Sequence, residues 1–312
     1  MNTSHLTMPR LDTLARLLAL SCTFIAPAFA QQAPMVREGA AVKVSEHVFV
    51  IPDDNVPGVP NVGIIVGRDG ILVVDTGMGE RNGAIVLKEA RRLGGDKPLW
   101  LVTTHVHPEH DLGASAFPAT TKMIRSRAQV DEIATAGMQT ADAFRRRSPE
   151  MRALLEGAKF RDADIVFDTE HEVNLGDVKA RLLAMGANHT AGDTVIVVDQ
   201  DHVLFSGDLA MKPLPAFASP KSSLAHWLTS LDRLDALKPR IVVPSHGPTG
   251  DAGFIAGYRR YLTRIRDRAA ELKRAGKSLE ETTQTITAEL KSEYPDTGRV
   301  GGAVRSAYAE AG

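Results

Sequence analysis

Histidines concentrate at the ends of predicted strands in this 312-residue chain. Five of its ten histidines hold such positions: His105, His107, His110, His189 and His246. The first three share one short loop after the apolar run 99–102, and the last follows the run 241–243. Asp208 stands in the same way after the run 203–205. Ligand sites in α/β proteins form at the C-terminal ends of strands, so we expect these loops to meet at one edge.

These residue types suit a metal site. Zinc binds imidazole nitrogen and carboxylate oxygen, and a catalytic zinc site keeps a position for water. The tight His-x-His-x-Glu-His loop at 105–110 offers donors on both sides of a pair of ions, and Asp208 can bridge the pair. Two ions about 3.5–4 Å apart can share a hydroxide and activate it near neutral pH. One histidine at a strand end would indicate a structural role, whereas five beside Gly, Pro or Thr favour metal binding.

Alternating strands and helices must position these loops. Apolar runs predict strands at 48–51, 62–66, 71–74, 99–102, 165–167, 173–175, 180–183, 195–198, 203–205 and 241–243. Helical periodicity predicts helices at 82–93, 224–237 and 254–272, and Ser278 with Glu281 predicts a capping box that opens a further helix. The polar segment 126–159 favours surface helices. The alternation indicates an α/β fold in one domain.

The first thirty residues predict a signal peptide. Arg10 and Arg16 precede an apolar run that ends in Ala28-Phe29-Ala30, the small-x-small pattern of a cleavage site. We therefore expect a periplasmic or secreted protein, with a main domain at 31–275 and a helical extension, 276–312, packed on that domain. Cys22 is the only cysteine and lies inside the predicted signal, so the mature chain would carry no disulfide.

The composition argues against several kinds of partner. Lysine and arginine number 37 against 38 aspartate and glutamate, which gives a formal net charge of -1. Nucleic acids and anionic membrane surfaces attract proteins with an excess of basic residues. We therefore expect no nucleic acid and, after signal cleavage, no membrane as a partner. A small-molecule substrate is the expected partner, and no pattern predicts an oligomeric state.

Five motifs, in this order, resemble those of the metallo-β-lactamase superfamily. They are Asp75-Thr76-Gly77, Thr104 to His110, His189-Thr190-x-Gly192-Asp193, Gly207-Asp208 and His246-Gly247, and they span roughly residues 45–250. The resemblance implies a four-layer αββα sandwich with the site along one edge of its two sheets. Within the superfamily, the chain looks most similar to the exported zinc metallohydrolases associated with quinoproteins and with sulfur oxidation.

The resemblance also implies a role for each motif residue. His105, His107 and His189 would hold a first zinc ion, while Glu109, His110 and His246 would hold a second. Asp208 would bridge the two ions, and Asp75 would fix the geometry of the ligand loop by hydrogen bonds. Glu109 or Asp208 would orient the nucleophile and could carry its proton.

The chain departs from the family pattern at Glu109, where the family usually has Asp. Glutamate is longer by one methylene, so its carboxylate reaches farther and has more rotamers. Two alternatives follow. In one, the second metal site is weaker or more distant, and Asp111 partly substitutes for the missing aspartate. In the other, the exchange is silent and the site holds two ions.

The expected activity is hydrolysis by metal-bound hydroxide of an ester, lactam, lactone or thioester bond. Fold does not select among these substrates. The proline-rich segments 52–60 and 211–220 are expected to flank the pocket and to favour a partly apolar substrate of medium size. Two other classes stay open: a mononuclear iron oxidoreductase on the same scaffold, and a non-catalytic periplasmic accessory protein.

Overall fold

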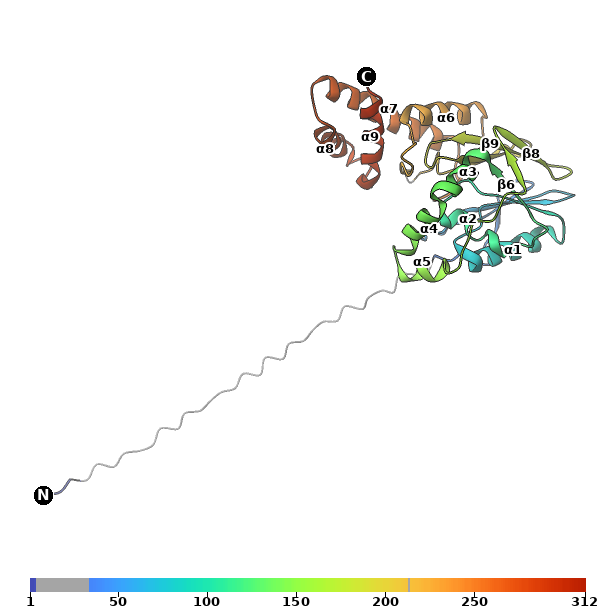
Figure 1. Cartoon of the computed structure of the whole chain (residues 1–312), viewed down its shortest axis with the longest axis horizontal. Helices are drawn as coiled ribbons and strands as arrows, with labels where there is room; N and C mark the ends of the chain where they lie inside the picture. Colours follow the sequence, from blue (N-terminus) through green and yellow to red (C-terminus); the bar gives the residue numbers. More distant parts are fainter. Residues whose placement is uncertain (4–33, 213) are drawn as a thin grey trace. The chain divides into compact units, whose positions relative to one another are not determined.

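The computed structural model describes residues 1–3, 34–212 and 214–312. The predicted signal peptide, 1–30, lies outside the described residues except for its first three. From residue 34 onward the chain forms two β-sheets between layers of helices (Figure 1). Mixed α/β architecture was the prediction, and the two sheets of the structure confirm it.

The first sheet has seven strands, which lie side by side in the order of the sequence. They are β1 (Val42–Lys43), β2 (Val48–Ile51), β3 (Val62–Val66), β4 (Ile71–Val74), β5 (Leu99–Val102), β6 (Lys122–Ser126) and β7 (Ile165–Phe167). The first four pair antiparallel, and β4 to β7 run parallel. The parallel part directs the loops after β4 and β5 to one edge of the sheet.

The second sheet has five strands in the order β12-β11-β10-β9-β8. They are β8 (Glu170–Asn174), β9 (Lys179–Gly186), β10 (Asp193–Val198), β11 (Val203–Gly207) and β12 (Ile241–Pro244). The strands β8 to β11 pair antiparallel, whereas β11 and β12 run parallel. The parallel pair brings the loops that follow β11 and β12 to the same end of the sheet.

Helices cover the outer face of each sheet. The elements before β8 are α1 (Gly79–Gly94), α2 (Pro108–Asp111), η1 (Ala114–Ala116), α3 (Arg127–Glu132), the π-helix η2 (Ile133–Gly137), α4 (Met138–Arg145) and α5 (Pro149–Leu154). Those after β11 are α6 (Leu224–Ala236), α7 (Gly253–Arg274), α8 (Leu279–Leu290), η3 (Thr297–Arg299) and α9 (Val300–Glu310). Figure 1 shows α1 on one side of the sheets and α6 on the other.

Three apolar cores separate the four layers. Leu72 and Val74 of the first sheet pack with Ile196 and Phe205 of the second in the core between the sheets. On the outer face of the first sheet, alternate residues of the same strands pack against α1, with Val86 at the contact. On the outer face of the second sheet, residues of β9 to β12 share a core with α6 to α9. Strand alternation thus builds the αββα sandwich, because the central strands β3, β4, β10 and β11 bury both of their faces.

Three elements that build the layers were missing from the prediction: β1, β6 and α9. Lys122 and Arg125 interrupt the apolar pattern of β6, yet Arg125 is buried there. The helix α9 buries only small side chains and valines, a weak periodic signal. The predicted capping box at α8 is present, since Ser278 N donates to Glu281 Oε2 at 2.9 Å and Glu281 N donates to Ser278 Oγ at 3.2 Å.

The residues after 276 pack on α6 and α7 rather than standing apart. Ile286 and Leu290 of α8, together with Val304 of α9, lie in the same core as Trp227 of α6. The division of the chain at 275 stays a prediction. Within the described residues, no helix combines the length and the apolar character needed to cross a membrane.

Candidate metal centre

The loop after β5 carries four of the predicted ligands. β5 ends at Val102, and His107 then caps the short helix α2, whose first residue is Pro108. Proline is pre-organised for the first helical position and needs no hydrogen-bond acceptor there. The helix turns Glu109 and His110 back toward His105, and the rings of His105 and His110 lie 4.1 Å apart.

Asp75 fixes this loop from the end of β4. Its Oδ1 accepts a hydrogen bond from Thr104 N at 2.7 Å, and its Oδ2 accepts one from His110 Nδ1 at 2.8 Å. Thr104 Oγ1 donates to Oδ2 at 3.0 Å, so that hydroxyl accepts from His105 Nδ1 at 3.1 Å. Asp75 therefore orients two imidazoles, one directly and one through Thr104, and leaves the Nε2 atom of each facing the site.

The loops after β4 and β5 also lie in direct backbone contact. Thr76 N donates to His110 O at 2.8 Å, and Gly113 N donates to Gly77 O at 2.9 Å. A Cβ atom at Gly113 would collide with the carbonyl oxygen of Thr76. Glycine at this position is therefore what allows the two loops to lie together.

His189 comes from the loop between β9 and β10. Its Nδ1 donates to Ala216 O at 2.6 Å, and a carbonyl can only accept, so in the neutral ring Nε2 keeps its lone pair for a metal ion. Asp193 holds the loop by accepting hydrogen bonds from His189 N at 2.6 Å and Thr190 Oγ1 at 2.7 Å. The motif His-Thr-x-Gly-Asp thus contains a predicted ligand, His189, and the aspartate that holds the loop of this ligand by hydrogen bonds.

The parallel strands β11 and β12 deliver Asp208 and His246. His246 Nδ1 donates to Val59 O at 3.0 Å, which again leaves Nε2 free. Asn61 holds the loop of His246 in place, because its Nδ2 donates to Pro244 O at 2.8 Å and to Gly247 O at 2.7 Å. The proline-rich segment 52–60 was expected to flank the pocket. Its residue Val59 contacts His246, and no residue of the segment lines the cavity beside the ligands.

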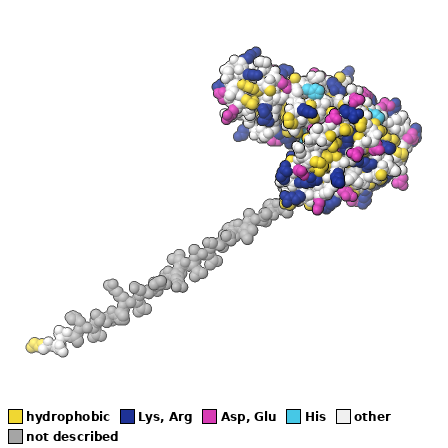
Figure 2. All heavy atoms as spheres, in the orientation of Figure 1, with side chains coloured by type: hydrophobic (Ala, Val, Ile, Leu, Met, Phe, Trp, Pro, Cys, Tyr) yellow, Lys and Arg dark blue, Asp and Glu magenta, His cyan; other side chains and the backbone are white. Residues whose placement is uncertain are grey.

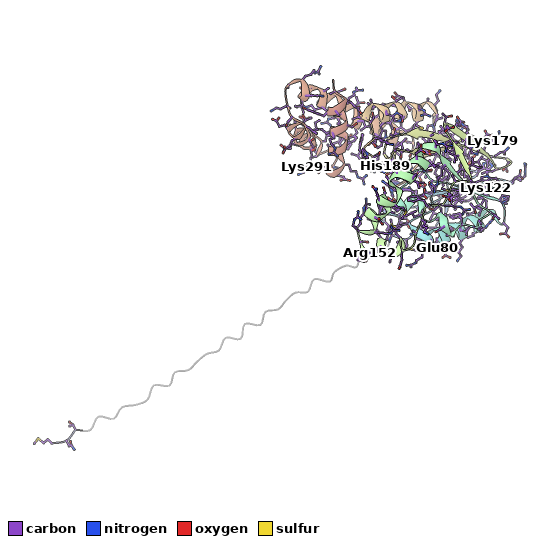
Figure 3. The ribbon with its side chains drawn as sticks, in the orientation of Figure 1. Glu80, Lys122, Arg152, Lys179, His189 and Lys291 are labelled. Atoms are coloured by element: carbon purple, nitrogen blue, oxygen red, sulfur yellow. The ribbon has the colours of Figure 1, made fainter. Side chains whose placement is uncertain are left out.

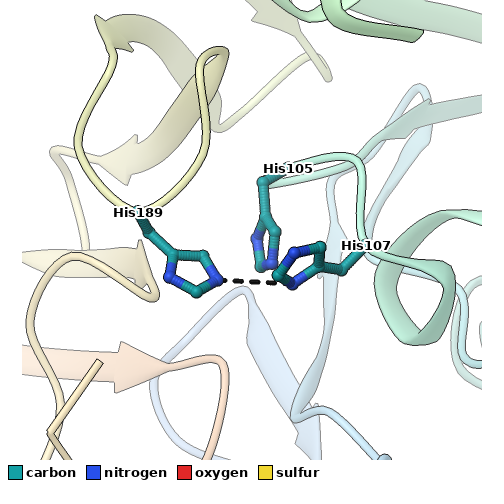
Figure 4. Close-up of side chains that lie close together, drawn as sticks. All are labelled: His105, His107 and His189. Carbon is teal, nitrogen blue, oxygen red and sulfur yellow. Dashed lines mark hydrogen bonds between the residues drawn. The ribbon is translucent and has the colours of Figure 1, made fainter. Parts of the chain in front are cut away.

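The seven predicted ligands come together as three overlapping groups. They are His105 with His107 and His189, His105 with His110 and Asp208, and Glu109 with His110 and His246. Within each group, all ligand atoms lie within 4.8 Å of one another. Figure 4 shows the first group, in which the imidazoles of His105, His107 and His189 converge. The first and third groups have the membership that the resemblance implies for the two ions.

The donor atoms fit metal ions. Four buried atoms of the predicted ligands have no hydrogen-bond partner among the described residues: His105 Nε2, His110 Nε2, Glu109 Oε2 and Asp208 Oδ1. Such buried polar atoms are costly unless something binds them. His107 Nδ1 lies 3.3 Å from His189 Nε2. Tetrahedral zinc, with bonds of about 2.0–2.1 Å, separates two nitrogen ligands by about 3.3–3.4 Å.

Burial and neighbouring charges shift the pKa values of the ligands in different directions. Burial lowers the pKa of His105 and His107 well below the ordinary value, and the neighbouring imidazoles lower it further, so both rings are neutral ligands. Burial alone would also lower the pKa of His110, but the Asp75 carboxylate outweighs it and raises that pKa to about 9. Burial opposes ionisation of Asp208, yet the surrounding histidines lower its pKa to about 2.

Asp111 does not substitute for an aspartate at position 109. It is fully buried and bound by Arg125, whose Nη2 donates to Oδ1 at 2.8 Å and whose Nη1 contacts Oδ2. Thr103 Oγ1 donates to Oδ2 at 2.8 Å as well. Glu109 itself reaches the site, with Oε1 at 4.0 Å from His110 Nε2.

A cavity of about 560 Å³ opens beside these ligands. Residues of the predicted segment 211–220 line it, namely Met211, Ala216 and Ala218. Figure 2 shows the surface hollowed between the C-terminal helices and the body of the domain, and Figure 3 labels His189 to the right of Lys291 and above Arg152 in the same view. The prediction of a partly apolar pocket wall at 211–220 therefore agrees with the cavity.

The opposite wall was missed by the sequence analysis. It consists of residues from η2 and α4, including Phe144, together with Arg147 after α4 and Arg299 at the end of η3. Segment 126–159 was expected only to form surface helices. The one local signal is the run Arg145-Arg146-Arg147, and nothing in this run indicates which of the three arginines faces the cavity.

Several known proteins resemble this chain. A linear primary-alkylsulfatase from Pseudomonas sp. is 26% identical over 216 residues, 59% of this chain and 40% of that protein. An acyl-coenzyme A thioesterase from Homo sapiens is 26% identical over 203 residues, 60% of this chain and 72% of that protein. The match thus spans well under half the length of the alkylsulfatase.

Solved structures share the fold. A stereoselective inverting sec-alkylsulfatase from Pseudomonas sp. aligns with a TM-score of 0.67 and 16% identity, over 86% of this chain and 49% of that one. A metallo-beta-lactamase family protein from Thermus thermophilus aligns with a TM-score of 0.61 and 16% identity, over 83% of this chain and 91% of that one. Their likeness confirms the four-layer sandwich.

The family assignment rests on the sequence. A model of the metallo-beta-lactamase superfamily matches residues 55–246, which include every predicted ligand. The curated relatives are hydrolases by name. The narrower likeness to quinoprotein-associated and sulfur-oxidation-associated enzymes stays a prediction. The chain belongs to the metallo-β-lactamase superfamily.

Proposed function

We propose that this protein is an exported hydrolase that binds two zinc ions and cleaves an ester-type bond. The observation that carries the proposal is the convergence of five histidines, Glu109 and Asp208 on a cavity, with four of their buried donor atoms lacking any other described partner. Zinc ions bound there would lower the pKa of a water molecule and polarise the bond to be cleaved.

The protein's own residues would hold and orient the reactants. Asp75 keeps His105 and His110 in one tautomer each, and Ala216 O does the same for His189. Glu109 lines the cavity, and its Oε2 has no hydrogen-bond partner in the described part of the chain, so it can hold an attacking water or take its proton. The mature chain would have no thiol nucleophile, since Cys22 precedes the predicted cleavage site.

The bond that is cleaved is part of the proposal. The sequence led us to expect an ester, lactam, lactone or thioester bond. The relative that is named acyl-coenzyme A thioesterase supports the thioester among these, and the relative that is named alkylsulfatase supports sulfate esters in addition. Two ions are favoured over one, because Glu109, His110 and His246 form a ligand group separate from that of His107 and His189. This argues against a mononuclear iron oxidoreductase.

The test combines metal analysis with a panel of substrates. The purified protein should contain about two zinc ions per chain and should hydrolyse at least one of an alkyl sulfate, a thioester, a 4-nitrophenyl ester, a lactone and nitrocefin. Chelation should abolish that activity, and added zinc should restore it. Two bound zinc ions without hydrolysis across the panel would instead support the accessory-protein alternative.

Export is tested separately. If residues 1–30 are a signal peptide, the protein recovered from the native host should begin at Gln31, as read from its intact mass. Recovery of the full-length chain from the cytoplasmic fraction would remove export from the proposal and leave the hydrolase assignment intact.

A further inference from the structure

Two arginines face the cavity beside the ligands. Arg147 follows α4, and Arg299 ends η3, so they come from segments far apart in the sequence. Arg299 lies beyond residue 246, where the superfamily match ends. Their convergence on one cavity is therefore a feature that the superfamily motifs do not encode.

Arg147 is held beside the ligands but keeps its charge available. Its guanidinium carbon lies 3.5 Å from the centre of the Phe144 ring, and that ring lies 5.5 Å from the ring of His107. A guanidinium stacked on an aromatic face keeps the N–H groups of its edge free. Among residues 34–212 and 214–312, no carboxylate lies within salt-bridge distance of it.

Arg299 is only partly neutralised. Its Nε donates to Asp296 Oδ2 at 2.7 Å. Its two terminal nitrogens have no hydrogen-bond partner in the part of the chain that the structure describes. Its side chain is 35% exposed. The two carboxylates that line the cavity, Glu109 and Asp208, both belong to the ligand groups. The arginine charges are thus left for something that enters the cavity.

Most of the remaining wall is apolar. Gln139 and Thr140 are its polar members, and its apolar members are Ala136, Ala143, Phe144, Met211, Ala216 and Ala218. We propose that Arg147 and Arg299 bind an anionic group on an otherwise apolar substrate, whose hydrocarbon part lies against these residues. Substrates of the proposed hydrolase would then be amphiphilic anions, a class narrower than esters in general, and this inference rests on that proposed function for its catalytic meaning.

The test measures binding without bond cleavage. Zinc-loaded protein is titrated calorimetrically with octane-1-sulfonate, whose carbon–sulfur bond is not an ester, and with octan-1-ol, which has the same chain and no charge. The wild-type protein should prefer the sulfonate by about tenfold or more, because charge-assisted bidentate contacts to Arg are strong. The preference should shrink in about 0.5 M salt, because salt screens exposed charges.

Substitutions of the two arginines test whether they cause the preference for the sulfonate. Arg147→Gln should lower the preference for the sulfonate over the alcohol by about tenfold, and Arg299→Gln by less, because Asp296 already shares its charge. Arg146→Gln is the matched control, since Arg146 is the exposed neighbour that does not line the cavity and should leave the preference unchanged. Thermal unfolding checks that every variant is folded.

Three results would overturn the inference: no preference in the wild-type protein, an undiminished preference in the double variant, or a preference that disappears only when zinc is removed. Each is distinct from a failure of the proposed function. A protein that hydrolyses nothing can still show the arginine-dependent preference for the sulfonate. If the protein is an active hydrolase but shows no such preference, only the proposed class of amphiphilic anionic substrates is wrong.

Discussion

The two walls of the cavity are built in opposite ways. The ligand wall, formed by the five histidines, Glu109 and Asp208, is mostly buried, and three of its histidines donate hydrogen bonds to Asp75, Ala216 and Val59. The arginine wall, formed by Phe144, Arg147 and Arg299 with neighbouring small residues, is more exposed and comes from helical segments. The ligand wall supports one kind of chemistry, whereas residues of the arginine wall can be exchanged without moving the metal ligands.

The largest expected effect comes from the ligand wall. His107→Ala should remove one nitrogen of the first ligand group, lower the bound zinc, and reduce hydrolysis at least about 10³-fold, because the metal's charge stabilisation of the transition state is worth several kcal/mol. Metal content and initial rates measure this. His226→Ala, at a histidine outside the site, is the control, and equal activity of the two variants would contradict the contrast between the walls.

The support behind the ligand loop is the next test. Asp111→Ala should destabilise the protein by about 3–5 kcal/mol, because it leaves the buried guanidinium of Arg125 without its carboxylate. Urea denaturation in the presence of a chelator measures the free energy of unfolding. The double variant Asp111→Leu with Arg125→Met should lose less, and a loss below about 1 kcal/mol in the single variant would show that Arg125 finds other partners.

A smaller effect is expected from the residue that orients the ligands. Asp75 has a φ of 65°, a left-handed conformation that asparagine tolerates. Asp75→Asn should therefore keep the fold but weaken zinc binding about 10–100-fold, since the orienting carboxylate becomes an amide. Competition against a zinc-binding dye measures the affinity. Unchanged affinity would mean that the backbone alone positions His110.

The smallest effect is expected at Glu109. Its carboxylate already lies with His110 and His246 in one ligand group, so Glu109→Asp should change the affinity for the second zinc ion by less than about tenfold. Stepwise zinc titration separates the two sites. A much tighter second site in the variant would favour the alternative in which glutamate weakens it.

How well each wall could be predicted from the sequence depends on whether its residues are positioned by nearby or by distant parts of the chain. The ligands of the first wall stand at strand ends within short motifs, and strand direction alone brings His105, Asp208 and His246 to one edge. The apolar runs predicted most strands, since a strand that is buried on both faces is a continuous apolar run in the sequence. Both depend on neighbours that are close along the chain.

The second wall depends on packing between distant segments. Arg147 and Arg299 reach the same cavity only because α9 and η3 fold back on α6 and α7, and no local pattern specifies that packing. The strand β6 was missed for a related reason, because Arg125 resembles a surface residue until its partner Asp111 is known. The role of segment 52–60 likewise depends on a contact with His246 across the sequence.

The contact at Gly113 has a consequence for mutational tolerance. This residue offers no ligand, no charge and no side chain, yet the loops that carry Asp75 and His110 meet at its backbone. Any larger residue there would wedge the two loops apart and displace several histidines at once. A saturation screen for activity should therefore find one of the least replaceable positions of the enzyme at a residue that never touches the substrate.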